Sequence, residues 1–107
     1  MAIASLSREE QRYYVYVIQL DDAVGARDNP RYPSVYVGQS VRPPRERFEQ
    51  HKRGYRASRV VKKHGRWLRS RLFEQYNPLP SRRAAEHAER ELASRLRKKG
   101  YTVYGGH

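Results

Sequence analysis

The sequence predicts an α+β fold, with strands near the start of the chain and a long helix near its end. Two early segments are rich in β-branched and aromatic residues, which favour strands. Later segments begin with proline or serine and are followed by glycine, which is typical of helices. The last of them repeats apolar residues every three to four positions, as an amphipathic helix does.

The first two strands are expected at Tyr13–Leu20 and Ser34–Ser40. Alternation along the first strand places Tyr14 and Tyr16 on the same face of the sheet. Between the strands, Asp21–Pro33 combines glycine, asparagine and proline with several charges, which predicts a loop. Two consecutive strands joined in this way most simply form an antiparallel pair.

Two helices are expected after the second strand. Pro43 and Pro44 suit the first turn of a helix, because the missing amide hydrogen of proline costs nothing there. This helix should run to about Arg53 and end before Gly54. A shorter helix should cover Ala57–Lys63.

Three further segments complete the expected extended structure. Trp67–Gln75 alternates two sets of side chains, which predicts a third strand. Asn77–Pro80 contains two prolines and predicts a turn. At the end of the chain, Tyr101–Tyr104 is expected as a short extended tail.

The longest helix is expected at Arg82–Lys99, with Ser81 as its N-cap and Gly100 as its stop. Glu89 falls inside the apolar stripe of this helix, so its carboxylate should face the body of the protein. A carboxylate in that position must either pair with a cation or ligate a metal, and the periodicity alone favours the salt bridge. The apolar members of the stripe are Ala85, Ala88, Leu92 and Leu96.

Length and composition limit the class of protein. A chain of 107 residues suffices for one domain, which we expect to cover residues 1–107 with its core at about 13–103. The absence of cysteine excludes disulfides and thiolate zinc sites, and it fits a reducing compartment such as the cytoplasm. No apolar run approaches the ~20 residues that cross a bilayer, and Met1–Gln11 contains no export signal.

Positive charge dominates the chain and is concentrated in its middle. There are 23 Lys and Arg residues against 11 Asp and Glu, a formal net charge of +12. Between Val41 and Arg71 there are twelve basic residues and only two acidic ones. Such a run is ordinarily a solvated face, and a membrane-surface helix is a weaker alternative because Gly54 and Gly65 interrupt it.

Aromatic residues interleave this basic run, which favours contact with the phosphates and bases of a nucleic acid. The partner is therefore expected to be nucleic acid, DNA rather than RNA. The residues expected to bind it are Arg42, Arg45, Lys52, Tyr55, Arg56, Arg59, Lys62 and Lys63.

Four other side chains are candidates for chemistry. Arg47 and His51 are four residues apart and share a helix face, although this spacing is also common at exposed surfaces. Tyr16 and Tyr36 lie on the two expected strands, where tyrosine often only packs. None of the four indicates a function by itself.

Taken in order, these residues resemble the GIY-YIG endonuclease domain. The first motif is Tyr14-Val15-Tyr16 and the second is Tyr36-Val37-Gly38. They are followed by a helix with Arg47 and His51 and by a later helix with Glu89. The resemblance spans roughly Tyr13 to Val103, and it is the order of the motifs that makes it specific.

The resemblance implies a small three-stranded antiparallel sheet flanked by helices, and hydrolysis of phosphodiester bonds with one divalent metal, Mg²⁺ or Mn²⁺. Tyr16 and Tyr36 would line the site, with Tyr16 deprotonating or orienting the attacking water. Arg47 would hold the scissile phosphate, and His51 would assist in proton transfer or contact the phosphate. Glu89 would be the only protein ligand of the metal.

Three functions are therefore open at the level of the sequence. The leading hypothesis is a metal-dependent endonuclease that cuts DNA. The second is a catalytically inactive module on the same fold that binds DNA or RNA, for which the basic run alone suffices. The third is a small basic protein associated with RNA or the ribosome. Monomer and homodimer are equally compatible with the sequence.

Overall fold

The computed structural model describes residues 11–106, in which four strands form one mixed sheet with the order β3-β1-β2-β4. The strands are β1 (Tyr14–Leu20), β2 (Ser34–Ser40), β3 (Gly65–Leu68) and β4 (Thr102–Gly105). The α-helices are α1 (Pro44–Arg53), α2 (Arg59–His64) and α3 (Arg82–Lys99). Three 3₁₀ turns lie between them: η2 (Asp22–Val24), η3 (Ser70–Leu72) and η4 (Glu74–Tyr76).

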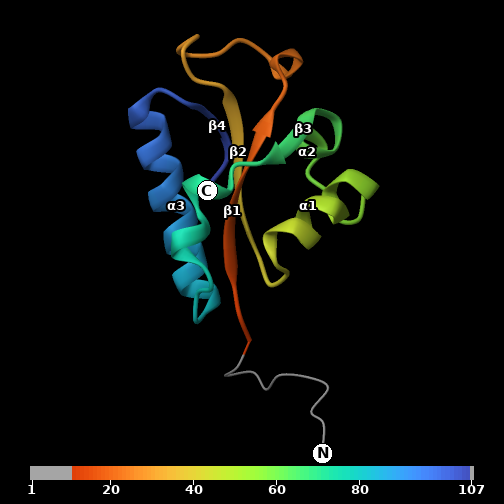
Figure 1. Cartoon of the computed structure of the whole chain (residues 1–107), viewed down its shortest axis with the longest axis vertical. Helices are drawn as coiled ribbons and strands as arrows, with labels where there is room; N and C mark the ends of the chain where they lie inside the picture. Colours follow the sequence, from red (N-terminus) through yellow and green to blue (C-terminus); the bar gives the residue numbers. More distant parts are fainter. Residues whose placement is uncertain (1–10, 107) are drawn as a thin grey trace, which may run out of the picture.

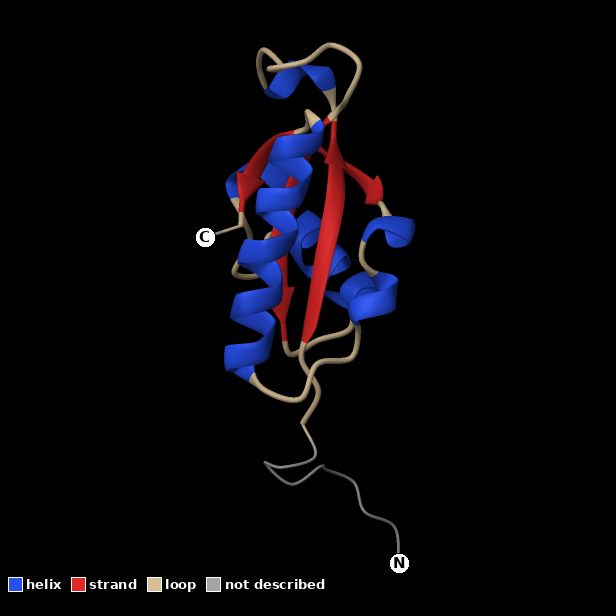
Figure 2. Cartoon of the chain, turned by 90° about the vertical axis from the view of Figure 1, so that its left-hand side faces the viewer, coloured by secondary structure: helices blue, strands red, loops and turns tan. Residues whose placement is uncertain are grey.

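The helices cover the two faces of the sheet, with α3 on one side and α1 and α2 on the other (Figures 1 and 2). In the antiparallel register of β1 and β2, Tyr16 pairs with Gly38 and Val17 pairs with Val37. Paired residues point to the same face, so one face carries the tyrosines and the other carries the valines. Because a side chain at Gly106 would touch both Val37 and Ala93 of α3, α3 covers the valine face.

Several expected elements are confirmed almost to the residue. β1, β2, α1 and α3 lie where the strand and helix patterns predict them. The Ser81 side chain accepts a hydrogen bond from the Ala84 amide at 3.0 Å and so caps α3. Gly54 and Gly100 follow α1 and α3 with positive φ angles, a conformation that glycine adopts without strain.

The third strand is shorter than predicted. β3 ends at Leu68, and the chain then forms η3 and η4 instead of continuing as a strand to Gln75. The reason lies on the edge of β1, where the Asn77 side chain accepts from the Val15 amide at 2.9 Å and donates to the Val15 carbonyl at 2.8 Å. One carboxamide thus supplies the pairing that another strand residue would give.

The tail after α3 is a fourth strand. Thr102–Gly105 pairs with β2 in parallel, with Ser34 opposite Thr102 and Val37 opposite Gly105. The α+β class is therefore correct, but the sheet is four-stranded and mixed rather than three-stranded and antiparallel. The β2–β4 ladder ends at Val37, so Gly38–Ser40 extend beyond it.

β3 forms one edge of the sheet and carries the only tryptophan of the chain, Trp67, which is 50% exposed. Within residues 11–106, no helix combines the length and the apolar character needed to cross a bilayer. The first ten residues lie outside the described residues, and they include most of Met1–Gln11, the segment in which the sequence predicts no export signal.

Candidate active site

The centre of the candidate site is a pair of stacked tyrosines on the face covered by α1. The rings of Tyr16 and Tyr36 lie 6.3 Å apart between centroids, with an angle of 28° between their planes. Gly38 makes this arrangement possible, because a Cβ there would lie 2.5 Å from the Tyr16 hydroxyl and 3.0 Å from the Tyr36 ring. The glycine of the second motif therefore provides space for the side chain of the first.

His51 of α1 joins the two tyrosines. Its ring is 1% exposed and lies 6.0 Å from the Tyr16 ring and 5.9 Å from the Tyr36 ring, measured between centroids. The Nε2 atom is 2.9 Å from the Tyr16 hydroxyl oxygen. Since both ring nitrogens of this buried residue have partners within the protein, His51 is placed to act on Tyr16 rather than to contact a phosphate directly.

The neighbours of His51 determine which nitrogen carries its proton. The Ser58 amide donates a hydrogen bond to Nδ1 at 3.0 Å, so Nδ1 acts as an acceptor and has no hydrogen. In the neutral ring the hydrogen is then on Nε2, which donates to the Tyr16 oxygen. Burial and the nearby charge of Arg47 lower the pKa of His51 to about 4, which favours this neutral form.

Arg47 lies between the tyrosines and the loop after α1. Its guanidinium donates to the Gln50 side chain at 3.1 Å, to the Tyr55 carbonyl at 3.2 Å and to the Arg56 carbonyl at 2.7 Å. A guanidinium has five N–H donors, so these contacts leave donors for a further oxygen. Arg47 therefore fixes the backbone of the loop while keeping capacity for an anion.

Glu89 of α3 is 7% exposed, which agrees with its place in the apolar stripe. Its charge contributes to raising the pKa of both Tyr16 and Tyr36, so the carboxylate acts electrostatically on the same two phenols. Among residues 11–106, no three His, Asp or Glu side chains form a group that could hold a metal. A metal on Glu89 would complete its coordination with phosphate and water oxygens, as Mg²⁺ commonly does.

The two phenols are held in their neutral form. Burial and the neighbouring Tyr36 raise the pKa of Tyr16 well above its ordinary value, and Arg47 opposes this shift. Burial also raises the pKa of Tyr36, whereas a hydrogen bond with the Ser58 side chain lowers it. Without an additional positive charge, neither phenol is ready to take a proton from water at neutral pH.

Ser58 was not among the residues singled out from the sequence, yet it contacts both sides of the site. Its amide sets the tautomer of His51, and its side chain lowers the pKa of Tyr36 and caps α2 by accepting from the Val61 amide. The sequence signal that could have found it is its position as a serine just before a helix.

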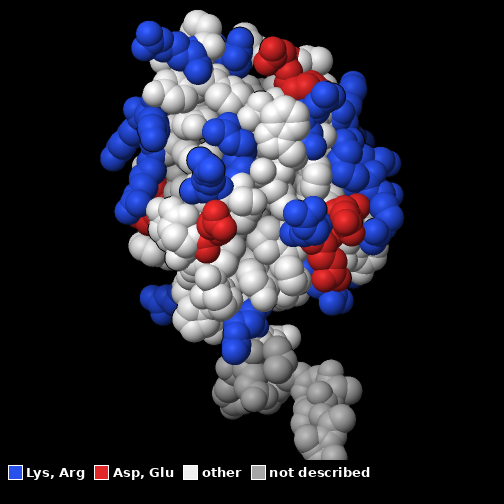
Figure 3. Space-filling model, in the orientation of Figure 1, with Lys and Arg blue, Asp and Glu red and all other residues white. Residues whose placement is uncertain are grey.

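The expected nucleic-acid contacts divide into two groups. Lys52 does not extend freely, because its ammonium donates to the Lys62 carbonyl at 3.1 Å and to the Gly65 carbonyl at 2.9 Å. Basic side chains gather along the side of the molecule formed by α1 and α2, and others lie along α3 (Figure 3). The other expected residues are exposed, as Lys52 itself is: Arg42, Arg45, Tyr55, Arg56, Arg59, Lys62 and Lys63.

His64, which the sequence suggests only as a surface residue, has a structural role. Its Nδ1 lies 2.9 Å from an Asp21 carboxylate oxygen, and the Asp21 amide donates to the His64 carbonyl at 2.9 Å. The histidine lowers the pKa of Asp21. This pair ties the end of β1 to the end of α2, the helix whose N-cap Ser58 contacts His51.

The chain matched no protein-family model, no curated protein and no solved structure in comparisons with known proteins.

Proposed function

We propose that the protein is a divalent-metal-dependent endonuclease that hydrolyses phosphodiester bonds in DNA, on a fold similar to that of GIY-YIG nucleases. The observation that supports this proposal most strongly is the convergence of Tyr16, Tyr36, His51 and Arg47 around one buried hydroxyl. These residues come from two strands and a helix, separated by up to 35 positions. Their order along the chain is also the order of the motifs.

The buried polar groups support a catalytic role over a purely structural one. Placing phenol and imidazole groups in a core costs free energy unless every polar atom has a partner. An apolar pair in the same positions would pack without that requirement. Perturbed pKa values in a cluster of this kind are typical of functional sites.

Phosphodiester hydrolysis needs a nucleophile made from water and relief of charge on the phosphoryl oxygens. In the proposed site, a Tyr16 phenolate stabilised by the Nε2–H of His51 would orient the water and take one of its protons, which returns Tyr16 to the neutral phenol. The remaining donors of Arg47 hold a phosphoryl oxygen.

Glu89 is the proposed ligand of the metal, Mg²⁺ or Mn²⁺, because it is a buried carboxylate whose charge acts on both tyrosines. When bound there, the cation supplies the positive charge that lowers the pKa of the phenols and of water and neutralises the phosphate. This would reverse the present effect of Glu89, which raises the pKa of Tyr16.

The test is cleavage of labelled single-stranded, duplex and branched DNA with Mg²⁺ or Mn²⁺ and with chelator. We expect metal-dependent cutting by the wild type and at least a ~100-fold loss in Glu89→Gln. Glu91→Gln is the matched control, because Glu91 lies on the same helix with an exposed side chain. Wild-type protein that cuts none of these substrates, or equal cutting by both variants, would contradict the proposal.

A binding module without catalysis is the second candidate. The raised pKa of Tyr16 favours it, because a neutral phenol cannot act as a base. Both candidates predict that log K falls with log salt, at a slope of roughly −0.9 per phosphate neutralised on duplex DNA. Only metal-dependent turnover separates them, and preferential binding to structured RNA would point to the RNA-associated alternative.

A further inference from the structure

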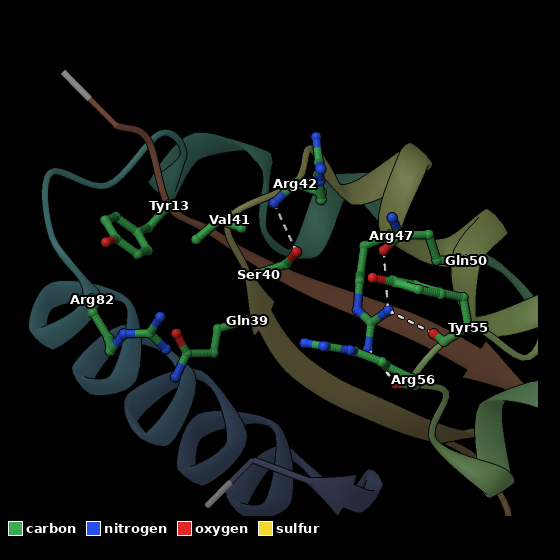
Figure 4. A pocket seen from close by; sticks show the side chains of 10 residues that line it. All are labelled: Tyr13, Gln39, Ser40, Val41, Arg42, Arg47, Gln50, Tyr55, Arg56 and Arg82. Carbon is green, nitrogen blue, oxygen red and sulfur yellow. Dashed lines mark hydrogen bonds between the residues drawn. The ribbon is translucent and has the colours of Figure 1, made fainter. Parts of the chain in front are cut away.

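A pocket of about 530 Å³ opens next to the candidate active site (Figure 4). It lies at the end of β2, where Gly38–Ser40 run on past the last residue paired with β4. Figure 4 shows Arg47, Tyr55 and Arg56 on one side of it and Gln39 and Arg82 on the other. The residues that line it are Tyr13, Gln39, Ser40, Val41, Arg42, Arg47, Gln50, Tyr55, Arg56 and Arg82.

The charge of the pocket indicates an anionic ligand. Four arginines line it, and no acidic residue is among its lining residues from the described part of the chain. Arg56 and Arg82 each lie 5.8 Å from a tyrosine ring centroid, those of Tyr55 and Tyr13 respectively. Both guanidiniums are thus oriented by aromatic rings while their N–H groups stay available.

The uncharged groups of the pocket indicate a nucleobase as part of the ligand. The Tyr55 ring is 54% exposed and offers a face on which a base can stack. The amides of Gln39 and Gln50 can both donate and accept hydrogen bonds, as the edges of bases require. The volume falls within the ~300–1,000 Å³ of pockets that hold small molecules.

Pairing decides which nucleic acid can use this pocket. In a duplex each base is stacked on both faces and paired along its edge, so it cannot enter a pocket without first leaving the helix. An unpaired nucleotide can place its base on an aromatic ring and its phosphate on arginine without that cost. Arg47 lines the pocket and is also hydrogen-bonded to Tyr16 of the candidate active site. A nucleotide in the pocket would therefore lie beside the phosphate to be cut.

We infer that this pocket binds one unpaired nucleotide of a DNA strand next to the scissile phosphate. The substrate is then single-stranded DNA, or DNA with an unpaired segment at the cut. This inference rests on the proposed function for the position of the cut, whereas nucleotide binding itself can be measured without catalysis.

The experiment measures how tightly the full-length protein binds a fluorescently labelled oligothymidine of about 12 nucleotides, and a labelled duplex of the same length. The fluorescence anisotropy of the oligonucleotide reports binding, and a chelator in the buffer prevents cleavage. Tyr55→Ala should weaken single-strand binding about tenfold and leave duplex binding within twofold. Arg82→Gln should weaken it about fivefold, since one phosphate contact is lost. Arg83→Gln is the matched control, an exposed arginine on the same helix that does not line the pocket.

Several results would overturn the inference. The first is wild-type protein that does not bind the single strand. The second is an equal loss of single-strand affinity in Arg82→Gln and Arg83→Gln. The third is a Tyr55→Ala variant that loses as much affinity for the duplex as for the single strand. Tighter binding of an oligouridine of equal length would overturn the assignment to DNA. Circular dichroism of each variant excludes unfolding as the cause, and the exposed Arg82 provides a test that does not depend on Tyr55.

The two proposals can fail separately. If the protein cuts DNA in a metal-dependent way but its single-strand binding does not change in Tyr55→Ala and Arg82→Gln, the pocket inference is wrong and the nuclease proposal stands. If single-strand binding depends on both residues but no DNA is cut, the pocket inference stands and the nuclease proposal is wrong.

Discussion

The two faces of the sheet are built from different kinds of side chains. On the face covered by α3, Val37 lies close to Ala93 in an apolar layer. On the face covered by α1, the buried groups include Tyr16 and His51 as well as the apolar Ile18, with the partly buried Tyr36 beside them. Glu89 of α3 is the buried charged side chain beside the apolar layer, whereas on the other face Tyr16 and His51 are hydrogen-bonded to each other.

The difference would separate stability from the proposed chemistry within one small sheet. An apolar layer gains free energy in proportion to the area it buries and tolerates many replacements of similar volume. A buried polar cluster gains little free energy, but each hydrogen bond fixes an orientation. We therefore expect changes of the apolar side chains on the valine face to act on folding, and changes on the tyrosine face or of Glu89, whose charge acts on both phenols, to act on cleavage.

The largest effect should come from Gly38→Ala, which places a Cβ 2.5 Å from the Tyr16 hydroxyl. Displacement of the phenol should lower cleavage at least about 100-fold. The added methyl group should also cost ~1–3 kcal/mol of stability. Cleavage per folded molecule, with urea unfolding as the measure of folding, checks both parts. Wild-type cleavage by this variant would mean that the position of Tyr16 does not matter.

The valine face should give the opposite result. Leu92→Ala removes a side chain that is 5% exposed on α3 and should lower the free energy of unfolding by about 3 kcal/mol. Cleavage per folded molecule should remain within about twofold of the wild type, because Tyr16 and Tyr36 lie on the opposite face of the sheet. A selective loss of cleavage in folded Leu92→Ala would break the separation of the two faces.

Acid should destabilise the tyrosine face through His51. Its pKa falls from 6.5 to about 4 on folding, so the unfolded chain binds a proton that the folded protein does not. Above pH 6.5, His51 is neutral in both states and does not lower the free energy of unfolding. As the pH falls from 6.5 towards 4, the unfolded chain takes up the proton first, and the free energy of unfolding decreases. Between pH 7 and pH 5 the loss should be about 2 kcal/mol. Urea unfolding at the two values should show it in the wild type and not in His51→Gln, and equal losses would assign the effect to other groups.

The smallest effect should come from Lys52, whose ammonium binds two backbone carbonyls. Lys52→Met should lower stability by about 1 kcal/mol while leaving the salt dependence of DNA binding unchanged. The exposed Lys63 provides the comparison, because Lys63→Met should leave stability unchanged and reduce the salt slope by about 0.9. Identical behaviour of the two variants would show that Lys52 is also used for binding.

Local patterns in the sequence predicted β1, β2, α1 and α3, because strand-forming residues, caps and helical periodicity lie within each element. They could not predict the end of β3, which depends on Asn77 reaching Val15 across 62 positions. They also could not predict β4, a strand of four residues whose parallel partner begins far earlier in the chain.

The candidate site shows the same limit. Glu89 was predicted to face inward from periodicity, and it does. The bonds from Arg47 to two loop carbonyls were not predictable, because they depend on how the backbone of Tyr55 and Arg56 folds back. The pairing of Arg82 with Tyr13 was missed for a similar reason, since it joins the start of α3 to the residue before β1.

The single tryptophan of the chain, Trp67 on β3, provides an intrinsic fluorescence signal. Because Trp67 is half exposed among basic residues, its indole emission should respond when a polyanion covers that side of the molecule. The same emission should shift when the edge strand separates from β1 during unfolding, as Gln19 pairs with Trp67. Association and denaturation can therefore be followed without attaching a dye to the protein.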